Sequence, residues 1–141
     1  MNQTSSGKPI SRRKARRLVV QALYSIDLGG MQHVQARGFP WYEGDEDLAF
    51  AQLLLDGTLE SIDAIDAAIR EHVEHWDLER IARVDLAILR LGVYSLLFRS
   101  DIPTHVAIDE AIELAKSLSS DASYRFINGV LDAVRKAAQL E

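Results

Sequence analysis

The chain has 141 residues, of which 48% are hydrophobic and 26% charged, the composition of one folded domain rather than of a disordered chain. It contains no cysteine, which excludes disulfides, cysteine-bound zinc, iron–sulfur clusters and thiol catalysis. The formal net charge of −5, taken over the whole chain, argues against nucleic acid, because proteins meet phosphates through a basic surface.

The charge is unevenly distributed along the chain. No acidic residue precedes Asp27, and from residue 18 onward ten basic residues stand against 21 acidic ones, a formal charge of −11. The other six basic residues lie within ten positions: Lys8, Arg12, Arg13, Lys14, Arg16 and Arg17. Such a split favours a polyanionic partner for the basic segment; the alternative is a solvated charge run without a specific role.

Apolar residues recur with helical spacing almost everywhere and no segment alternates convincingly with period two, so we predict an all-α fold. Residues 1–10 are expected to form a flexible tail, residues 11–28 the first helix, and residues 31–45 mostly loop. The core-facing stripe of the first helix is predicted to be Ala15, Leu18, Val19, Ala22, Leu23 and Ile26. The opposite face carries Arg13, Arg17, Gln21 and Tyr24, with Val20 beside them and Arg12, Lys14 and Arg16 on the flanks. Tyr24 is either a binding residue or a ring that lies over aliphatic stems or is covered by the acidic loop, residues 43–47.

A second helical stretch is predicted over residues 48–75, bent or interrupted at Gly57-Thr58. Three more helices are predicted over residues 78–99, 104–118 and about 120–138, and Thr104 is the predicted N-cap of the helix 104–118. Their inward stripes are predicted to include Ile108, Ala111, Ile112, Ala115 and Leu118, then Tyr124, Ile127, Leu131 and Val134. The segment 78–99 is apolar nearly all round, which predicts the central helix of a C-terminal bundle. Its narrow polar edge, Asp85 and Ser95 with Gly92 between them, is expected to reach the surface or another chain. Gly129, inside the last helix, should cost about 1 kcal/mol against alanine unless a backbone or ligand comes close.

Signatures of catalysis and of membrane insertion are weak or missing in the sequence. No apolar run approaches the roughly 18 residues of a membrane span and no secretory apolar segment is seen, so we expect a soluble, cytoplasmic protein. Phosphate loops, nucleophile elbows and dinucleotide-binding fingerprints are also missing.

We interpret His72 and His75, with Glu71 and Glu74, as a solvated helix end rather than a metal site. Asp109, Glu110 and Glu113 are read as a solvent-facing surface, so neither enzyme activity nor a metal or cofactor is expected.

Three stretches, which together span nearly the whole chain, resemble one family. They are residues 12–25, with Arg-Arg-Lys-Ala-Arg-Arg leading into Val20 to Ser25; residues 84–103, from Val-Asp-Leu-Ala-Ile-Leu-Arg to Asp-Ile-Pro; and residues 106–132, the most specific block. In these stretches the chain resembles the bacterial transcription antitermination factor NusB family. It departs from many members at Leu118-Ser119, where they have Phe-Gly. Many members also carry an acidic residue at the position of Ala122, and in this chain the acidic residue stands one position earlier, as Asp121. Arg17 stands where some members have an acid.

The resemblance implies two packed three-helix subdomains, about 11–76 and 77–141, meeting near Trp76-Asp77. It also implies binding of the boxA element of nascent ribosomal RNA transcripts together with ribosomal protein S10 (NusE), in a complex with elongating RNA polymerase and other Nus factors. The implied RNA-contacting residues are Arg12, Arg13, Lys14, Arg16, Arg17, Gln21, Lys116, Arg125 and Phe126. The implied contacts to NusE are Tyr24 and Asp85.

Two alternatives to this function come from other classes of protein. One is a helical protein–protein adaptor without RNA binding. The other is the accessory domain of a ribosomal RNA methyltransferase, which the lack of a cofactor-binding α/β segment disfavours. A homodimer that buries the basic face is also open from sequence, and it would be incompatible with RNA binding.

Overall fold

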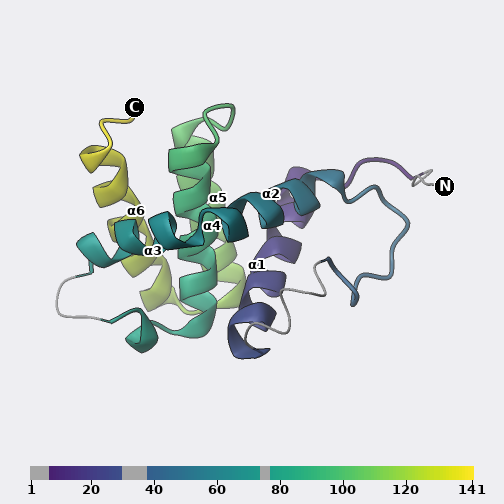
Figure 1. Ribbon diagram of the computed structural model, residues 1–141, viewed down its shortest axis with the longest axis horizontal. Coiled ribbons are helices and arrows are strands. Elements are labelled where there is room, and N and C mark those ends of the chain that lie inside the picture. The colour runs from purple at the N-terminus through teal and green to yellow at the C-terminus, as the bar shows by residue number, and fades with distance from the viewer. Residues whose placement is uncertain (1–6, 30–37, 74–76) are drawn as a thin grey trace. The chain divides into compact units, whose positions relative to one another are not determined.

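The computed structural model describes residues 7–29, 38–73 and 77–141, and these residues form helices joined by loops (Figure 1). The α-helices are α1 (Arg12–Gly29), α2 (Ala49–Glu60), α3 (Ile62–Glu71), α4 (Arg83–Phe98), α5 (Thr104–Leu118) and α6 (Asp121–Ala137), with a 3₁₀ helix at Leu78–Arg80. Within the described ranges the only β-type pairing is an isolated bridge between Pro9 and Asp47. The predicted all-α fold is confirmed. None of the described helices is long and apolar enough to cross a membrane.

The chain divides into two compact units, Met1–Gly57 and Thr58–Glu141. The division therefore falls within the last turns of α2, whereas the sequence predicted it near residues 76 and 77. The physical reason is the packing of α3, which lies against α4 and the 3₁₀ helix and so belongs with the C-terminal elements. The spacing of apolar residues within a helix does not show which distant helix it packs against.

In the first unit, α1 begins after Ser11, whose hydroxyl accepts a hydrogen bond from the Lys14 amide at 3.1 Å and caps the helix. The predicted core stripe is buried except for Ile26, which is half-buried. Val20 and Arg16, predicted on or beside the outer face, are 0% and 7% exposed. The buried arc of α1 is therefore wider than the apolar stripe alone predicts.

The segment preceding α1 is tied to the acidic loop. The Ile10 amide donates to the Asp47 carbonyl at 3.0 Å, the Asp47 amide donates to the Lys8 carbonyl at 2.7 Å, and Ile10 is buried. The expected flexible tail of residues 1–10 is therefore wrong for residues 8–10, because burying Ile10 and pairing its backbone favours order. Residues 1–6 of that prediction lie outside the described part. The Asp47 carboxylate also accepts from the Ala49 amide at 2.9 Å, capping α2.

In the second unit, α4 is the central helix (Figure 1). It packs against α3, α5 and α6, and α5 packs against α6. Leu86, Ile88, Leu89 and Val93 are all buried, which confirms the prediction for this helix. Gly92 is buried as well, and a Cβ placed there would lie 3.0 Å from two methyl carbons of Leu131. The close approach of α6 to α4 therefore depends on this glycine.

Several helix boundaries differ from the sequence-based ones. The predicted helix 48–75 is interrupted at Ser61 rather than at Gly57-Thr58, and Thr58 is fully buried within α2. The predicted helix 78–99 is divided into the 3₁₀ helix and α4. Gly57 does not end α2, which is consistent with the cost of only about 1 kcal/mol for a glycine inside a helix.

The cap of α5 also differs from the prediction. Thr104 is the first helical residue, and Pro103 precedes it as the cap, with no side-chain hydrogen bond. The extended Pro103 backbone places its carbonyl to accept the first helical bond, from the Ala107 amide at 3.0 Å. The inward face of α5 is shifted too: Ala111 and Ala115 are buried as expected, together with Ala107 and Leu114. The predicted Ile108, Ile112 and Leu118 are half-buried.

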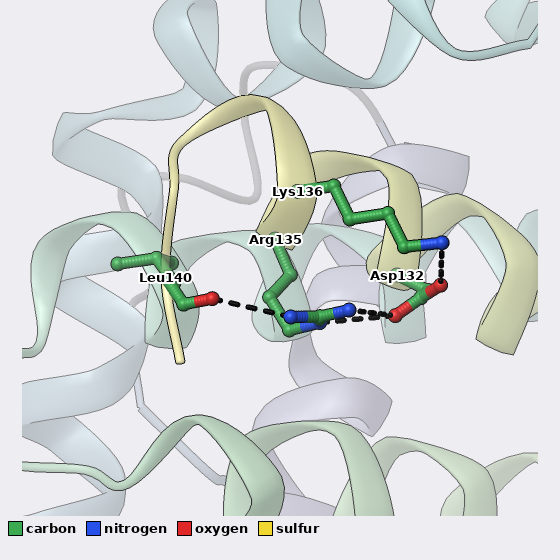
Figure 2. A network of polar contacts seen from close by, with 4 residues as sticks. All are labelled: Asp132, Arg135, Lys136 and Leu140. Atoms are coloured by element: carbon green, nitrogen blue, oxygen red, sulfur yellow. Dashed lines mark hydrogen bonds and ion pairs between the residues drawn. The ribbon is translucent and has the colours of Figure 1, made fainter.

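The end of α6 is held by a polar network (Figure 2). Asp132 accepts hydrogen bonds from Arg135 Nε at 3.0 Å and Nη2 at 2.8 Å, and its other oxygen lies 3.1 Å from Lys136 Nζ. Arg135 Nη1 also donates to the Leu140 carbonyl at 3.2 Å. The hydrogen bond from Arg135 lowers the pKa of the Asp132 carboxyl. The two cations in the last turn complement the helix dipole and tie residue 140 to α6.

Candidate nucleic-acid interface

The first two turns of α1 carry a group of exposed cations: Arg12, Arg13, Lys14 and Arg17. No acidic residue lies in the first turn of this helix. Cations at a helix N-terminus oppose the helix dipole, so the dipole does not account for their position. Together with the dipole they create a positive potential, which is the requirement of a site for a polyanion.

Phe50 of α2 orders two of the basic side chains. The Arg12 guanidinium carbon lies 3.7 Å from the Phe50 ring centroid and that of Arg16 lies 6.0 Å from it. Arg12 remains exposed, whereas Arg16 is buried, so the predicted display of Arg16 on a solvent-facing flank is wrong. The reason is the neighbouring helix, which the helical wheel of α1 does not contain. The role predicted for Arg16 in binding RNA stays a prediction.

The acidic loop contacts this basic surface. Glu46 lies 3.7 Å from Lys14 Nζ and accepts a hydrogen bond from the Tyr42 hydroxyl at 2.7 Å. That hydrogen bond raises the pKa of Tyr42. The carboxylate of Glu46 therefore orients Lys14 and partly offsets its charge.

Gln21 and Tyr24 continue the outer face of α1 beyond Arg17. Gln21 is half-buried, and its side-chain oxygen accepts a hydrogen bond from Trp41 Nε1 at 3.0 Å. Tyr24 is 38% exposed, which agrees with its predicted outward position. Sequence reasoning missed Trp41, since nothing in the local pattern of a Gly- and Pro-containing loop indicates that it returns to α1.

A second group of predicted RNA contacts lies on α5 and α6. Lys116 and Arg125 are exposed, and their charged groups lie 5.1 Å and 5.9 Å from the centroid of the Tyr124 ring. Tyr124, predicted on the core face of α6, is only half-buried, and both cations lie near its ring. Phe126 is half-buried too. The second unit thus presents two cations beside an aromatic ring, the combination that suits single-stranded RNA.

Asp85 has the environment that differs most from its prediction. It is 6% exposed, and its two carboxylate oxygens accept hydrogen bonds from Ser119 Oγ at 2.7 Å and Ser123 Oγ at 2.9 Å. Ser95 is also buried and donates to the Leu91 carbonyl at 2.9 Å. The predicted polar edge on the surface is therefore wrong, because serines of the α5–α6 segment and the helix's own backbone satisfy it.

Asp85 nevertheless lines a cavity of about 350 Å³ in the second unit. The other lining residues are Arg80, Ile81, Ala82, Ala122, Ser123 and Phe126. A side chain of a partner entering this largely apolar cavity would meet the carboxylate at its wall. Asp85 can thus contact a partner only through the cavity, and the predicted contact with NusE stays a prediction.

The predicted site residues divide between the units. Arg12, Arg13, Lys14, Arg16, Arg17, Gln21 and Tyr24 belong to the first unit, and Asp85, Lys116, Arg125 and Phe126 to the second. Among the described residues no group of three histidine, aspartate or glutamate side chains is arranged to hold a metal ion. Glu74 and His75, which belong to the predicted solvated helix end, lie outside the described residues.

Exposed cations at the start of a helix, with aromatic rings beside them, are a combination typical of proteins that bind polyanions. The comparison with known families identifies the family to which the chain belongs. The model of the NusB family matches residues 13–136, and the chain belongs to that family.

Curated relatives and solved structures agree with this assignment. The transcription antitermination protein NusB of Treponema pallidum is 45% identical over 134 residues, covering 92% of this chain and 95% of the relative. NusB of Bacillus licheniformis is 41% identical, with 89% and 97% covered. The structure of T. maritima NusB superposes with a TM-score of 0.77 at 35% identity, covering 91% of this chain and 92% of that one. A structure of NusB and NusE in complex with double-stranded RNA gives a TM-score of 0.74 at 27% identity, with 89% and 96% covered.

Proposed function

We propose that this chain is an RNA-binding transcription antitermination factor that binds boxA of nascent ribosomal RNA transcripts together with ribosomal protein S10 (NusE). In that complex it promotes processive elongation by RNA polymerase, alongside other Nus factors. The observation that carries the proposal is the group of exposed cations on α1 in a chain whose remainder is strongly acidic. Membership of the NusB family and the likeness to a NusB–NusE–RNA complex support it.

The residues have complementary roles in this proposal. Arg12, Arg13, Lys14 and Arg17 bind backbone phosphates, for which the planar guanidinium is well suited. Arg16 and Gln21 support that surface, and Lys116, Arg125 and Phe126 extend RNA contact to the second unit. The acidic remainder repels RNA from other surfaces and so favours one mode of binding.

NusE is assigned separate contacts in this proposal. Tyr24 offers an exposed ring, and the cavity lined by Asp85 accepts a side chain of the partner. The protein acts by recognition alone, without catalysis, and works in the cytoplasm, where nascent transcripts are made.

A titration of labelled boxA RNA, with and without NusE, tests the proposal. We expect NusE to tighten RNA binding about tenfold or more, because the two ligands share one composite site. For about five phosphate contacts, the logarithm of affinity should fall against the logarithm of salt with a slope near −3.5. A scrambled RNA of equal length is the control for sequence preference.

The adaptor alternative makes the opposite prediction. NusE would then bind fully, while boxA RNA would neither bind nor change the affinity for NusE. The family comparisons favour the RNA-binding function. Sedimentation with and without RNA tests the homodimer, since a dimer that buries the cations must dissociate when RNA binds.

A further inference from the structure

We propose that Trp41 is a base-stacking residue, which extends the RNA-binding surface of α1 with an uncharged contact. The inference rests on the proposed function, because it concerns the same RNA. It adds a residue of the loop between α1 and α2, a segment in which neither motif nor spacing predicted a binding role.

The indole of Trp41 is held at two points while much of it stays accessible. Its Nε1 donates to the Gln21 side-chain oxygen at 3.0 Å. Its ring meets Phe39 at a centroid distance of 5.8 Å and an interplanar angle of 84°, and Phe39 is itself buried. Even so, Trp41 is 40% exposed. An exposed aromatic ring whose orientation is already fixed loses little conformational entropy when a base stacks on it.

The hydrogen bond to Gln21 places the indole at the end of a row that begins with two proposed phosphate-binding arginines. Arg13, Arg17 and Gln21 are spaced four residues apart, so they follow one another along a single face of α1. With a rise of 1.5 Å per residue the row is about 12 Å long, the length of roughly two to four nucleotides. A strand whose phosphates lie along Arg13 and Arg17 therefore brings a base to the position of Trp41.

The chemistry of the loop favours a base over a phosphate. The indole donor is already occupied by Gln21, which leaves the ring's π surface as the available contact. Glu43 and Asp45, exposed nearby in the sequence, would repel a phosphate but not the face of a neutral base. Stacking on tryptophan accepts every base, so this contact adds affinity with little sequence preference.

The first test measures the affinity of Trp41→Ala for boxA RNA at several salt concentrations. We expect binding about tenfold weaker, with the salt slope unchanged, because stacking releases no counterions. Trp41→Phe should retain most of the affinity. Leu53→Ala, at an exposed apolar residue of α2 to which no binding role is assigned, is the matched control and should bind as wild type does. Equal affinities of Trp41→Ala and wild type would overturn the inference.

An RNA series in which each nucleotide in turn is made abasic locates the stacked base. Wild type should lose affinity at one position where Trp41→Ala loses none, the non-additivity expected of a direct contact. Additive losses at every position would contradict stacking. If Trp41→Ala weakens binding of NusE but not of RNA, the ring meets the protein partner and the inference is wrong.

Fluorescence provides a measurement that does not depend on removing the ring. The chain has two tryptophans, so Trp76→Phe leaves Trp41 as the only indole. Saturating boxA RNA should quench its emission, and unchanged emission on bound protein would oppose the inference. If wild type does not bind boxA RNA at all, both the proposed function and the stacking role of Trp41 are wrong. If wild type binds boxA RNA and substitution of Trp41 has no effect, only the stacking role is wrong.

Discussion

The cations of α1 in the first unit and Asp85 of α4 in the second have opposite environments. In the first, the cations of α1 such as Arg13 and Arg17 are exposed at a helix end where they oppose the helix dipole. In the second, Asp85 is withdrawn into the bundle and receives two serine hydroxyls. Most of the α1 cations lie on the surface, whereas the carboxylate of Asp85 joins α4 to the α5–α6 segment.

This difference indicates which residues serve binding and which serve the stability of the fold. Exposed charges contribute little to folding, because water screens their interactions. A buried carboxylate that accepts hydrogen bonds must keep its partners, since removing one side leaves polar groups unsatisfied. Substitutions in the first unit should therefore change affinity, and substitutions around Asp85 should change the free energy of unfolding.

The largest effect is expected from replacing Arg13 and Arg17 together by alanine. Loss of two phosphate contacts should weaken boxA binding by about 30- to 100-fold and make the salt slope shallower by about 1.4. The free energy of unfolding should change by less than about 0.5 kcal/mol, measured by urea denaturation. Unchanged RNA binding would contradict the comparison, because these exposed cations would then not contact the RNA.

Asp85→Ala should lower the free energy of unfolding by about 2 kcal/mol, since the hydroxyls of Ser119 and Ser123 lose their acceptor. Asp85→Asn keeps one acceptor oxygen, so its free energy of unfolding should fall by less than that of Asp85→Ala. Urea denaturation measures both, and binding of NusE is measured under conditions where each variant is folded. A variant that is fully stable yet fails to bind NusE would show that Asp85 serves the partner alone.

The smallest effects are expected at two glycines of the second unit, which form a matched pair. A methyl group at Gly92 would press on Leu131, which is fully buried, so Gly92→Ala should destabilise by about 1 kcal/mol or more. At Gly129 the same methyl group would meet nothing within 4 Å, so Gly129→Ala should stabilise by up to about 1 kcal/mol. Thermal unfolding compares them. Equal shifts of the unfolding temperature would mean that α6 does not approach α4 as closely as described. Weaker binding of RNA or NusE by Gly129→Ala would show that a ligand approaches this exposed glycine.

Local patterns predicted much of the fold. The all-round apolarity of residues 86–98 indicated a central helix, and α4 is one. The 3.6-residue spacing in α1 identified six core positions, of which five are buried. These predictions succeeded because the periodicity of a helix translates directly into which face is covered.

The candidate site was harder to predict because its contacts join distant residues. Arg16 is buried near Phe50 of another helix, and Trp41 is bonded to Gln21 twenty positions earlier. The expected flexibility of residues 8–10 failed for the same reason, since their partner is Asp47. A helical wheel describes one helix and holds no information about what packs on it.

The sequence by itself determined the helical class, the central position of α4 and the segregation of positive charge into the first helix, since each follows from composition or periodicity along the chain. Tertiary structure alone decided which of those charges stay exposed, where the two units divide, and that Asp85 is bound by serines rather than by solvent. These outcomes depend on contacts between residues far apart in the sequence. Only the folded chain brings such groups within hydrogen-bonding distance and removes them from water.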